Sequence, residues 1–327
     1  MRPATLPNKK PEYLIWRRLG WIVRDGTQTG LLDVPGATLH YKIRGDGPAL
    51  LVLPGGDGDA DATDALAAGL TGRYAVISYD RRGQVRSPLQ DADATVDVAT
   101  HGDDAARVLA AVAGGPALVL GVSLGALIGL DLICRHPHQV RRLVAHEPPA
   151  TELLPEPERQ QAVHAQQEIE RLYREEGLAA AMRRLPALGG VDVTDREPDV
   201  AVPRPRPERI ANLAFFLSHD APAVRLHRLA WPGLRAAAGR IVPAAGATST
   251  GFPRQCARAL AEELGRPLAE FPGGHSGFVL RPTAFAARLH DVLDQATGPA
   301  RDPAAADPAG PRPRSDGRQP SRPVAQP

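Results

Sequence analysis

This chain of 327 residues has few cysteines, almost no net charge and no long apolar run. Its two cysteines, Cys134 and Cys256, lie far apart on predicted helices, which argues against a disulfide framework or a zinc site. The 39 basic and 37 acidic residues leave a formal net charge of +2, so no general basic field favours a nucleic-acid partner. No stretch approaches the ~18 apolar residues that a membrane-spanning helix needs.

The N-terminal segment also lacks the pattern of a secretory signal. Its apolar stretch is interrupted by Arg17 and Arg18, and no small-residue cleavage pattern follows. We therefore expect a soluble, cytoplasmic protein that acts on a small-molecule substrate and has neither nucleic acid nor a membrane as its partner. The sequence leaves the oligomeric state open.

Short apolar segments alternate with helical segments over most of the chain. The segments ALLVLPGG, YAVISYD and PALVLGV are typical of buried strands, and DDAARVLAAVA between two of them is typical of a helix. This alternation predicts an α/β fold, in which helices cover both faces of a mostly parallel sheet.

The alternation breaks in one region, where strand signals disappear and helical spacing dominates, as in ERQQAVHAQQEIERLYREEG. Such an insertion would cover the carboxyl ends of the strands, where open α/β sheets bind ligands. The tail contains mainly Pro, Ala, Arg and Asp, a composition typical of disorder. The predicted organisation is an N-terminal arm (1–29), an α/β core (30–147 and 235–296), a helical lid (148–234) and a disordered tail (297–327).

A serine lies at a sharp junction between a predicted strand and a predicted helix. Ser123 follows the strand segment PALVLGV and precedes an apolar helical pattern, with Gly121 and Gly125 two residues away on either side. Small neighbours let the backbone double back there without collisions. The pattern Gly-x-Ser-x-Gly in this context predicts a nucleophile elbow, which exposes the serine hydroxyl at the edge of the sheet.

A serine alone is a poor nucleophile and needs a base within hydrogen-bond reach. His275 is the candidate base, because it follows a late predicted strand in the segment FPGGHSGF. The glycines there allow a loop to bring the imidazole over the end of the sheet. No other histidine of this chain combines a loop at a strand end with so late a position.

These segments, together with LPGGDG after an early strand and YDRRGQVRS after the next, resemble those of the α/β-hydrolase superfamily over about residues 30–295. The resemblance implies an oxyanion hole formed by the backbone amides of Gly56 and Leu124. Pro54 stands where the family usually has histidine. Because both expected donors are backbone groups, this difference leaves the chemistry intact.

The segment YDRRGQVRS resembles the family's Asp-x-Arg-Gly-x-Gly-x-Ser turn, with Val85 in place of the second glycine. In such proteins the turn is mainly structural. The resemblance therefore implies that Asp80 and Arg82 hold loops near the site and take no part in the chemistry.

The position of the triad acid departs from the usual pattern. The family most often places an Asp after the strand GRIVPAAG, but the loop that follows here, GATSTGF, contains no carboxylate. Some members carry the acid after the preceding strand, where this chain has Glu147 in VAHEPP. We therefore expect Glu147 to orient His275. Asp220 and a dyad of Ser123 and His275 alone are the alternatives.

The predicted function is that of a serine hydrolase that cleaves a small-molecule ester or a related acyl bond through an acyl-enzyme, with no cofactor or metal. Perhydrolysis and hydrolysis of a C–C bond use the same triad and stay open. A non-catalytic binding protein on this fold is a further alternative. The elbow carries no Asp, which argues against the chemistry of dehalogenases and epoxide hydrolases.

Overall fold

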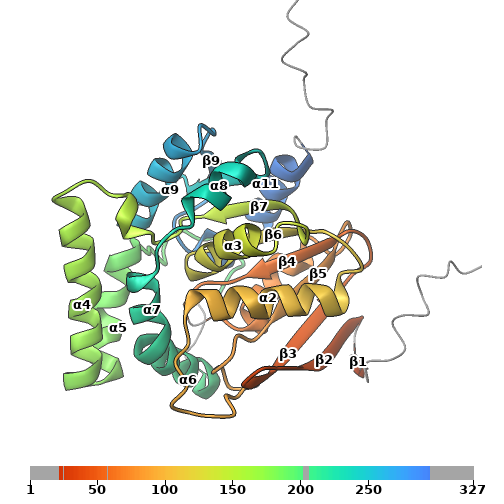
Figure 1. Ribbon diagram of the computed structural model, residues 1–327, viewed down its shortest axis with the longest axis horizontal. Helices are drawn as coiled ribbons and strands as arrows, with labels where there is room; N and C mark the ends of the chain where they lie inside the picture. Colours follow the sequence, from red (N-terminus) through yellow and green to blue (C-terminus); the bar gives the residue numbers. More distant parts are fainter. Residues whose placement is uncertain (1–21, 25, 57, 202–205, 295–327) are drawn as a thin grey trace, which may run out of the picture.

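A computed structural model describes residues 22–24, 26–56, 58–201 and 206–294 of the chain. The described residues form a nine-stranded sheet with helices on both faces and a group of helices at one side (Figure 1). This confirms the predicted α/β class. The predicted disordered tail lies outside the described residues.

The strands follow the order β1-β2-β3-β5-β4-β6-β7-β8-β9 across the sheet. Neighbours from β1 to β5 are antiparallel, and every pair from β5 to β9 is parallel. The strands are β1 (Ile22–Arg24), β2 (Thr27–Val34), β3 (Ala37–Arg44), β4 (Ala49–Leu53), β5 (Ala75–Tyr79), β6 (Ala117–Val122), β7 (Val140–His146), β8 (Ile241–Gly246) and β9 (Ala269–Phe271).

The sheet begins earlier than the sequence predicted. Residues 22–24 and 27–29, assigned to the N-terminal arm, contribute β1 and the first three residues of β2, which pairs antiparallel with β3. The first four residues of β2, TQTG, carry no apolar side chain. A strand at the margin of a sheet is held by backbone hydrogen bonds and needs no apolar alternation, so the pattern gave no signal there.

Helices cover the two faces of the sheet through two separate apolar clusters. One cluster joins the sheet to α2, α3, α8 and α9, and the other joins it to α1, α10 and α11. The core helices are α1 (Asp64–Ala68), α2 (Val98–Val112), α3 (Leu124–Arg135), α8 (Trp231–Ala237), α9 (Phe252–Glu263), α10 (Gly277–Leu280) and α11 (Pro282–Asp294). Short 3-10 turns are η2 (Ala60–Thr63), η3 (Thr151–Leu153) and η5 (Ala238–Arg240).

The helices at one side of the sheet lie between β7 and α8 in the chain (Figure 1). They are α4 (Glu158–Glu176), α5 (Leu178–Gly189), α6 (Pro207–Phe215), the π-helix η4 (Phe216–Asp220) and α7 (Ala221–Leu226). We call this segment the helical insertion. It has a small apolar core of its own around Ile169, Ala181 and Leu217. That it acts as a lid stays a prediction.

None of the helices in the described ranges is long and apolar enough to cross a membrane. The longest of them, α4, has 19 residues, but it is strongly charged and buries only one side. Its apolar side faces α5 and α7 of the helical insertion.

All six residues of β6, a strand in the interior of the sheet, are buried. We expect Leu120→Ala to lower the free energy of unfolding by about 2–5 kcal/mol, since Leu120 is 0% exposed and its loss leaves a cavity. Urea denaturation measures the change. The matched control is Leu31→Ala on β2, where the side chain is 63% exposed and the expected loss is below about 0.5 kcal/mol. Equal losses in the two variants would contradict this account of the core.

Candidate active site

Ser123 lies at the tight turn between β6 and α3, as the elbow pattern predicted. Its backbone has φ 55° and ψ −122°, a conformation that costs energy in a residue with a side chain. A Cβ atom on Gly125 would overlap the Leu53 carbonyl, and one on Gly121 would overlap the Gly125 carbonyl. Both positions therefore require glycine for the turn to close.

The start of α3 and the loop after β4 present two backbone amides near this turn. The Ser123 N–H donates to the His146 carbonyl over 2.9 Å, which ties the elbow to the end of β7. The N–H groups of Leu124 and Gly56 have no acceptor among the described residues, and both residues line the same cavity as Ser123. Unpaired donors at a helix N-terminus suit a developing negative charge.

His275 is held by a carboxylate from another strand. It lies in the loop after β9, and its Nδ1 is 2.6 Å from Oε2 of Glu147. This bond leaves Nε2 as the ring nitrogen available to a reacting group. Ser123 and His275 line one cavity, without a direct hydrogen bond between them. Such bonds are often long before substrate binds.

Glu147 follows the last residue of β7 and is fully buried. Its backbone has φ 51°; Glu147 and Ser123 are the only non-glycine residues in the described ranges with positive φ. Its Oε1 accepts from the Gly246 N–H at 2.9 Å, and its Oε2 accepts from the Ser249 hydroxyl at 3.0 Å. Burial alone would raise the pKa of Glu147, but His275, His146 and the Gly246 amide lower it to about 2. The carboxylate therefore stays ionised at neutral pH.

The alternative acid, Asp220, is engaged elsewhere. Its Oδ1 is 2.9 Å from Nε2 of His101, and its Oδ2 is 3.6 Å from Arg81. Of the two carboxylates that the sequence offered, the structure thus brings only Glu147 to His275. The catalytic roles of these residues stay predictions.

The turn with YDRRGQVRS holds neighbouring segments together. Asp80 accepts from the Ala60 N–H at 2.9 Å and from Arg86. Arg82 forms a two-pronged bond of 2.7 Å to each oxygen of Asp104 in α2. These contacts are consistent with the structural role expected of Asp80 and Arg82.

A cavity of about 720 Å³ lies between Ser123 and the helical insertion. The core contributes Ser123, His275, Leu124 and Gly56 to its wall. Most of the remaining wall is apolar and comes from the helical insertion, including Ile169, Met182, Leu185, Leu213, Phe216 and Val224. The insertion thus shapes the space above the serine.

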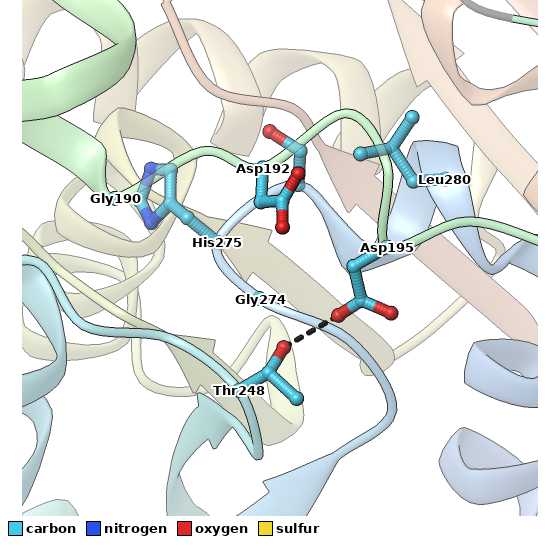
Figure 2. Close-up of a pocket in the computed structure, with 8 residues that line it drawn as sticks. Gly190, Asp192, Asp195, Thr248, Gly274, His275 and Leu280 are labelled. Atoms are coloured by element: carbon cyan, nitrogen blue, oxygen red, sulfur yellow. Dashed lines mark hydrogen bonds between the residues drawn. The ribbon is translucent and has the colours of Figure 1, made fainter.

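A second cavity of about 210 Å³ opens on His275 (Figure 2). Figure 2 shows that the segment with Gly190, Asp192 and Asp195 passes beside the imidazole. Asp195 fastens this segment to the core, since it accepts from Thr248 Oγ1 and from Arg281 Nε, each at 2.6 Å. His275 is therefore approached from two cavities.

Sequence reasoning missed two residues that support the site. The Ser249 hydroxyl bonds Glu147 from the loop that lacks a carboxylate, so this loop supplies donors in place of an acid. The Arg81 guanidinium is buried against the loop after β4. The short polar residues of GATSTGF and the doubled arginine of YDRRG were the available signals.

Comparisons with known proteins show the family to which this fold belongs. A family model described as alpha/beta hydrolase fold matches residues 48–189. The uncharacterized hydrolase YraK of Bacillus subtilis is 38% identical over 271 residues, which cover 81% of this chain and 96% of that protein. The 2-(acetamidomethylene)succinate hydrolase of Mesorhizobium japonicum is 30% identical over 114 residues, 35% of this chain and 40% of that protein.

Two solved structures illustrate the likeness of the fold. A thermophilic esterase from Thermogutta terrifontis has a TM-score of 0.64 and 18% identity, with 82% of this chain and 99% of that chain covered. The enol-lactonase from Burkholderia xenovorans LB400 has a TM-score of 0.60 and 22% identity, with 81% and 99% covered. At these identities the likeness shows the fold.

His146, next to Glu147, is an unusual buried group. Its imidazole is 0% exposed and meets the rings of Phe271 and Phe285 edge-on. Neither ring nitrogen has a hydrogen-bond partner within the described part of the chain. Burial lowers the pKa of His146 to about 4.

We expect the free energy of unfolding to decrease as the pH falls from 6.5 toward 4. The fold keeps the His146 imidazole neutral down to a pH of about 4. In the unfolded chain the same imidazole binds a proton below the ordinary histidine pKa of 6.5, so acid favours unfolding. The loss from this group reaches about 3 kcal/mol at pH 4. The contribution of the Glu147 carboxylate to the free energy of unfolding is lost only when the pH falls below the ordinary glutamate pKa of 4.5.

Urea denaturation across this pH range tests the assignment. His146→Phe removes the titrating group, so the slope between pH 6.5 and 4.5 should become smaller by up to about 1.4 kcal/mol per pH unit. The exposed His138→Phe, in the turn between α3 and β7, is the matched control for loss of a histidine. Identical slopes in wild type and His146→Phe would show that His146 does not carry this pH dependence.

Proposed function

Since the chain belongs to the α/β-hydrolase family, we propose that it is a serine hydrolase that cleaves an ester or a related acyl bond through an acyl-enzyme. The observation that carries the proposal is the 2.6 Å contact of His275 Nδ1 with the buried Glu147 carboxylate, beside a cavity that Ser123 also lines. Relatives named as hydrolases support it.

Formation of the acyl-enzyme follows from the roles of these groups. Ser123 Oγ attacks the acyl carbon while His275 Nε2 accepts the hydroxyl proton. Glu147 keeps Nδ1 protonated and stabilises the imidazolium that forms. The amides of Gly56 and Leu124 donate to the oxyanion. When the tetrahedral intermediate collapses, the alcohol leaves with the proton from Nε2.

Hydrolysis of the acyl-enzyme uses the same groups in reverse. Water attacks the acyl carbon and gives a proton to His275 Nε2, and the proton returns to Ser123 Oγ as the acid leaves. The smaller cavity beside His275 is bordered by Asp192, Thr248 and Ser276, so it offers water a polar approach to the imidazole. We assign this cavity to the passage of water.

The larger cavity favours a substrate with an apolar portion. Its volume of about 720 Å³ lies in the range of small-molecule sites, and side chains such as Leu213, Phe216 and Phe278 border it. We expect esters with an aliphatic or aromatic acyl group of several carbons to be cleaved faster than acetates, because burial of each CH₂ group contributes about 0.8 kcal/mol.

Removal of the nucleophile is the direct test. We expect Ser123→Ala to lower the turnover of p-nitrophenyl butyrate by about 10⁶-fold and to abolish labelling by a fluorophosphonate probe. The protein should stay folded, because alanine fits the turn as well as serine does. Ser218→Ala, at an exposed position of η4, is the matched control and should keep full turnover. Undiminished turnover in Ser123→Ala would refute the serine mechanism.

The role of the acid is tested by Glu147→Gln. We expect kcat to fall by about 10² to 10⁴-fold with the fold intact, because glutamine keeps the size of the side chain but cannot stabilise the imidazolium. Glu147→Asp should restore only part of the loss, since its shorter side chain is less able to reach His275. The exposed Glu262→Gln on α9 is the control. Full turnover in Glu147→Gln at neutral pH would mean that a dyad or another acid operates.

A further inference from the structure

Arg81 is buried beneath the loop that follows β4, which we call the glycine loop (residues 54–56 and 58). Its side chain is only 2% exposed. It donates to the carbonyls of Pro54 at 3.1 Å and of Gly58 at 3.3 Å, and also to the carbonyl of Gly56. A guanidinium has a rigid fork of donors, so three carbonyls bound to one such group hold the loop in one shape.

This arrangement helps to determine where the Gly56 amide points, together with a turn within the loop in which the Gly58 N–H donates to the Gly55 carbonyl over 2.8 Å. Glycine has a wide choice of backbone conformations, so Gly55 and Gly56 alone would not hold a single one. With the carbonyls of Pro54 and Gly56 held by Arg81, the Gly56 N–H between them is left without an acceptor in the described residues. It is the amide proposed above as an oxyanion donor.

The counter-charge of Arg81 comes from the helical insertion. Oδ2 of Asp220 is 3.6 Å from Nη2 of Arg81, and both side chains are 2% exposed. The other carboxylate oxygen is 2.9 Å from Nε2 of His101 on α2. A buried cation needs such a partner, because desolvation without one is strongly unfavourable. The core and the helical insertion thus share one buried polar contact.

The same π-helix also contacts the glycine loop directly. Asp220 is the last residue of η4 and Phe216 is the first. The Phe216 ring lies against Gly56, where a Cβ atom would be 3.4 Å from three ring atoms. Single π-helical turns are rare and frequently occur at functional sites. Here one such turn contacts the loop from its cavity side and supplies the charge that holds Arg81.

We propose that Arg81 is a positioning residue for the Gly56 amide, and that Asp220 holds Arg81 in place only while the helical insertion is docked on the core. The proposal rests on the proposed function, because Arg81 and Asp220 support the same oxyanion hole. When the insertion docks, Asp220 holds Arg81 and Arg81 positions the Gly56 amide, so docking of the insertion completes the oxyanion hole.

Arg81→Lys and Arg82→Lys form a matched pair of variants. Both residues are buried arginines of the same turn, and each substitution keeps the charge but loses the fork. The Arg82 fork binds Asp104 and the Pro35 carbonyl, which lie outside the glycine loop. Loss of stability should therefore occur in both variants, whereas a change in the oxyanion site should occur only in Arg81→Lys.

We expect kcat per titrated active site to fall about 10²-fold in Arg81→Lys, with KM within twofold of wild type, because an oxyanion donor acts mainly in the transition state. A trifluoromethyl ketone, which forms a tetrahedral adduct with serine, should bind more weakly by a similar factor. The matching methyl ketone should bind unchanged. Asp220→Asn should show a smaller loss of the same kind, and Arg82→Lys should keep the kcat of wild type.

Amide hydrogen exchange of the full chain gives a readout that is independent of activity. Peptides that cover the glycine loop should exchange faster in Arg81→Lys and Asp220→Asn, and at the wild-type rate in Arg82→Lys. Unchanged exchange in Arg81→Lys, or an equal loss of kcat in Arg82→Lys, would overturn the proposal. Absence of ester turnover in the wild type would instead contradict the proposed function, and the exchange result would still decide the role of Arg81 in the loop.

Discussion

The candidate site depends on how closely helix α3 approaches strands β4 and β6. This approach requires two glycines. A side chain on Gly125 would overlap the Leu53 carbonyl, and a side chain on Gly121 would overlap the Gly125 carbonyl. The chain can then reverse at Ser123, and the Ser123 amide bonds the end of β7. The close approach of α3 to the two strands thus decides where Ser123 lies, and the hydrogen bond of its amide follows from that position.

The Glu147 carboxylate joins the ends of two neighbouring parallel strands. The carboxyl ends of β7 and β8 meet at the same edge of the sheet, so a carboxylate from either strand end can lie behind the same histidine. Here Glu147 comes from β7, and the loop after β8 contributes Gly246 and Ser249 as hydrogen-bond donors. The carboxylate beside the imidazole of His275 thus comes from the end of β7, and the loop after β8, which has no carboxylate, supplies donors to it.

The helical insertion is joined to the core by polar contacts as well as apolar ones. Asp195 accepts hydrogen bonds from Thr248 and Arg281 of the core, and Asp220 reaches His101 and Arg81 in the interior. Buried polar contacts have strict geometry, and for that reason they specify one docked position more narrowly than apolar packing does. The cavity above Ser123 takes its shape from that position.

The sequence alone determined the features that local patterns encode. The apolar segments predicted the parallel strands, and the glycines around Ser123 predicted the sharp turn, because backbone sterics act between residues close in the chain. The strands before β3 escaped prediction, since backbone pairing leaves no pattern in polar residues such as TQTG. Only the tertiary structure decided that Glu147 rather than Asp220 lies against His275 and that Arg81 supports the glycine loop. Those contacts join segments far apart in the chain, and their geometry depends on how the strand ends and the helical insertion pack together.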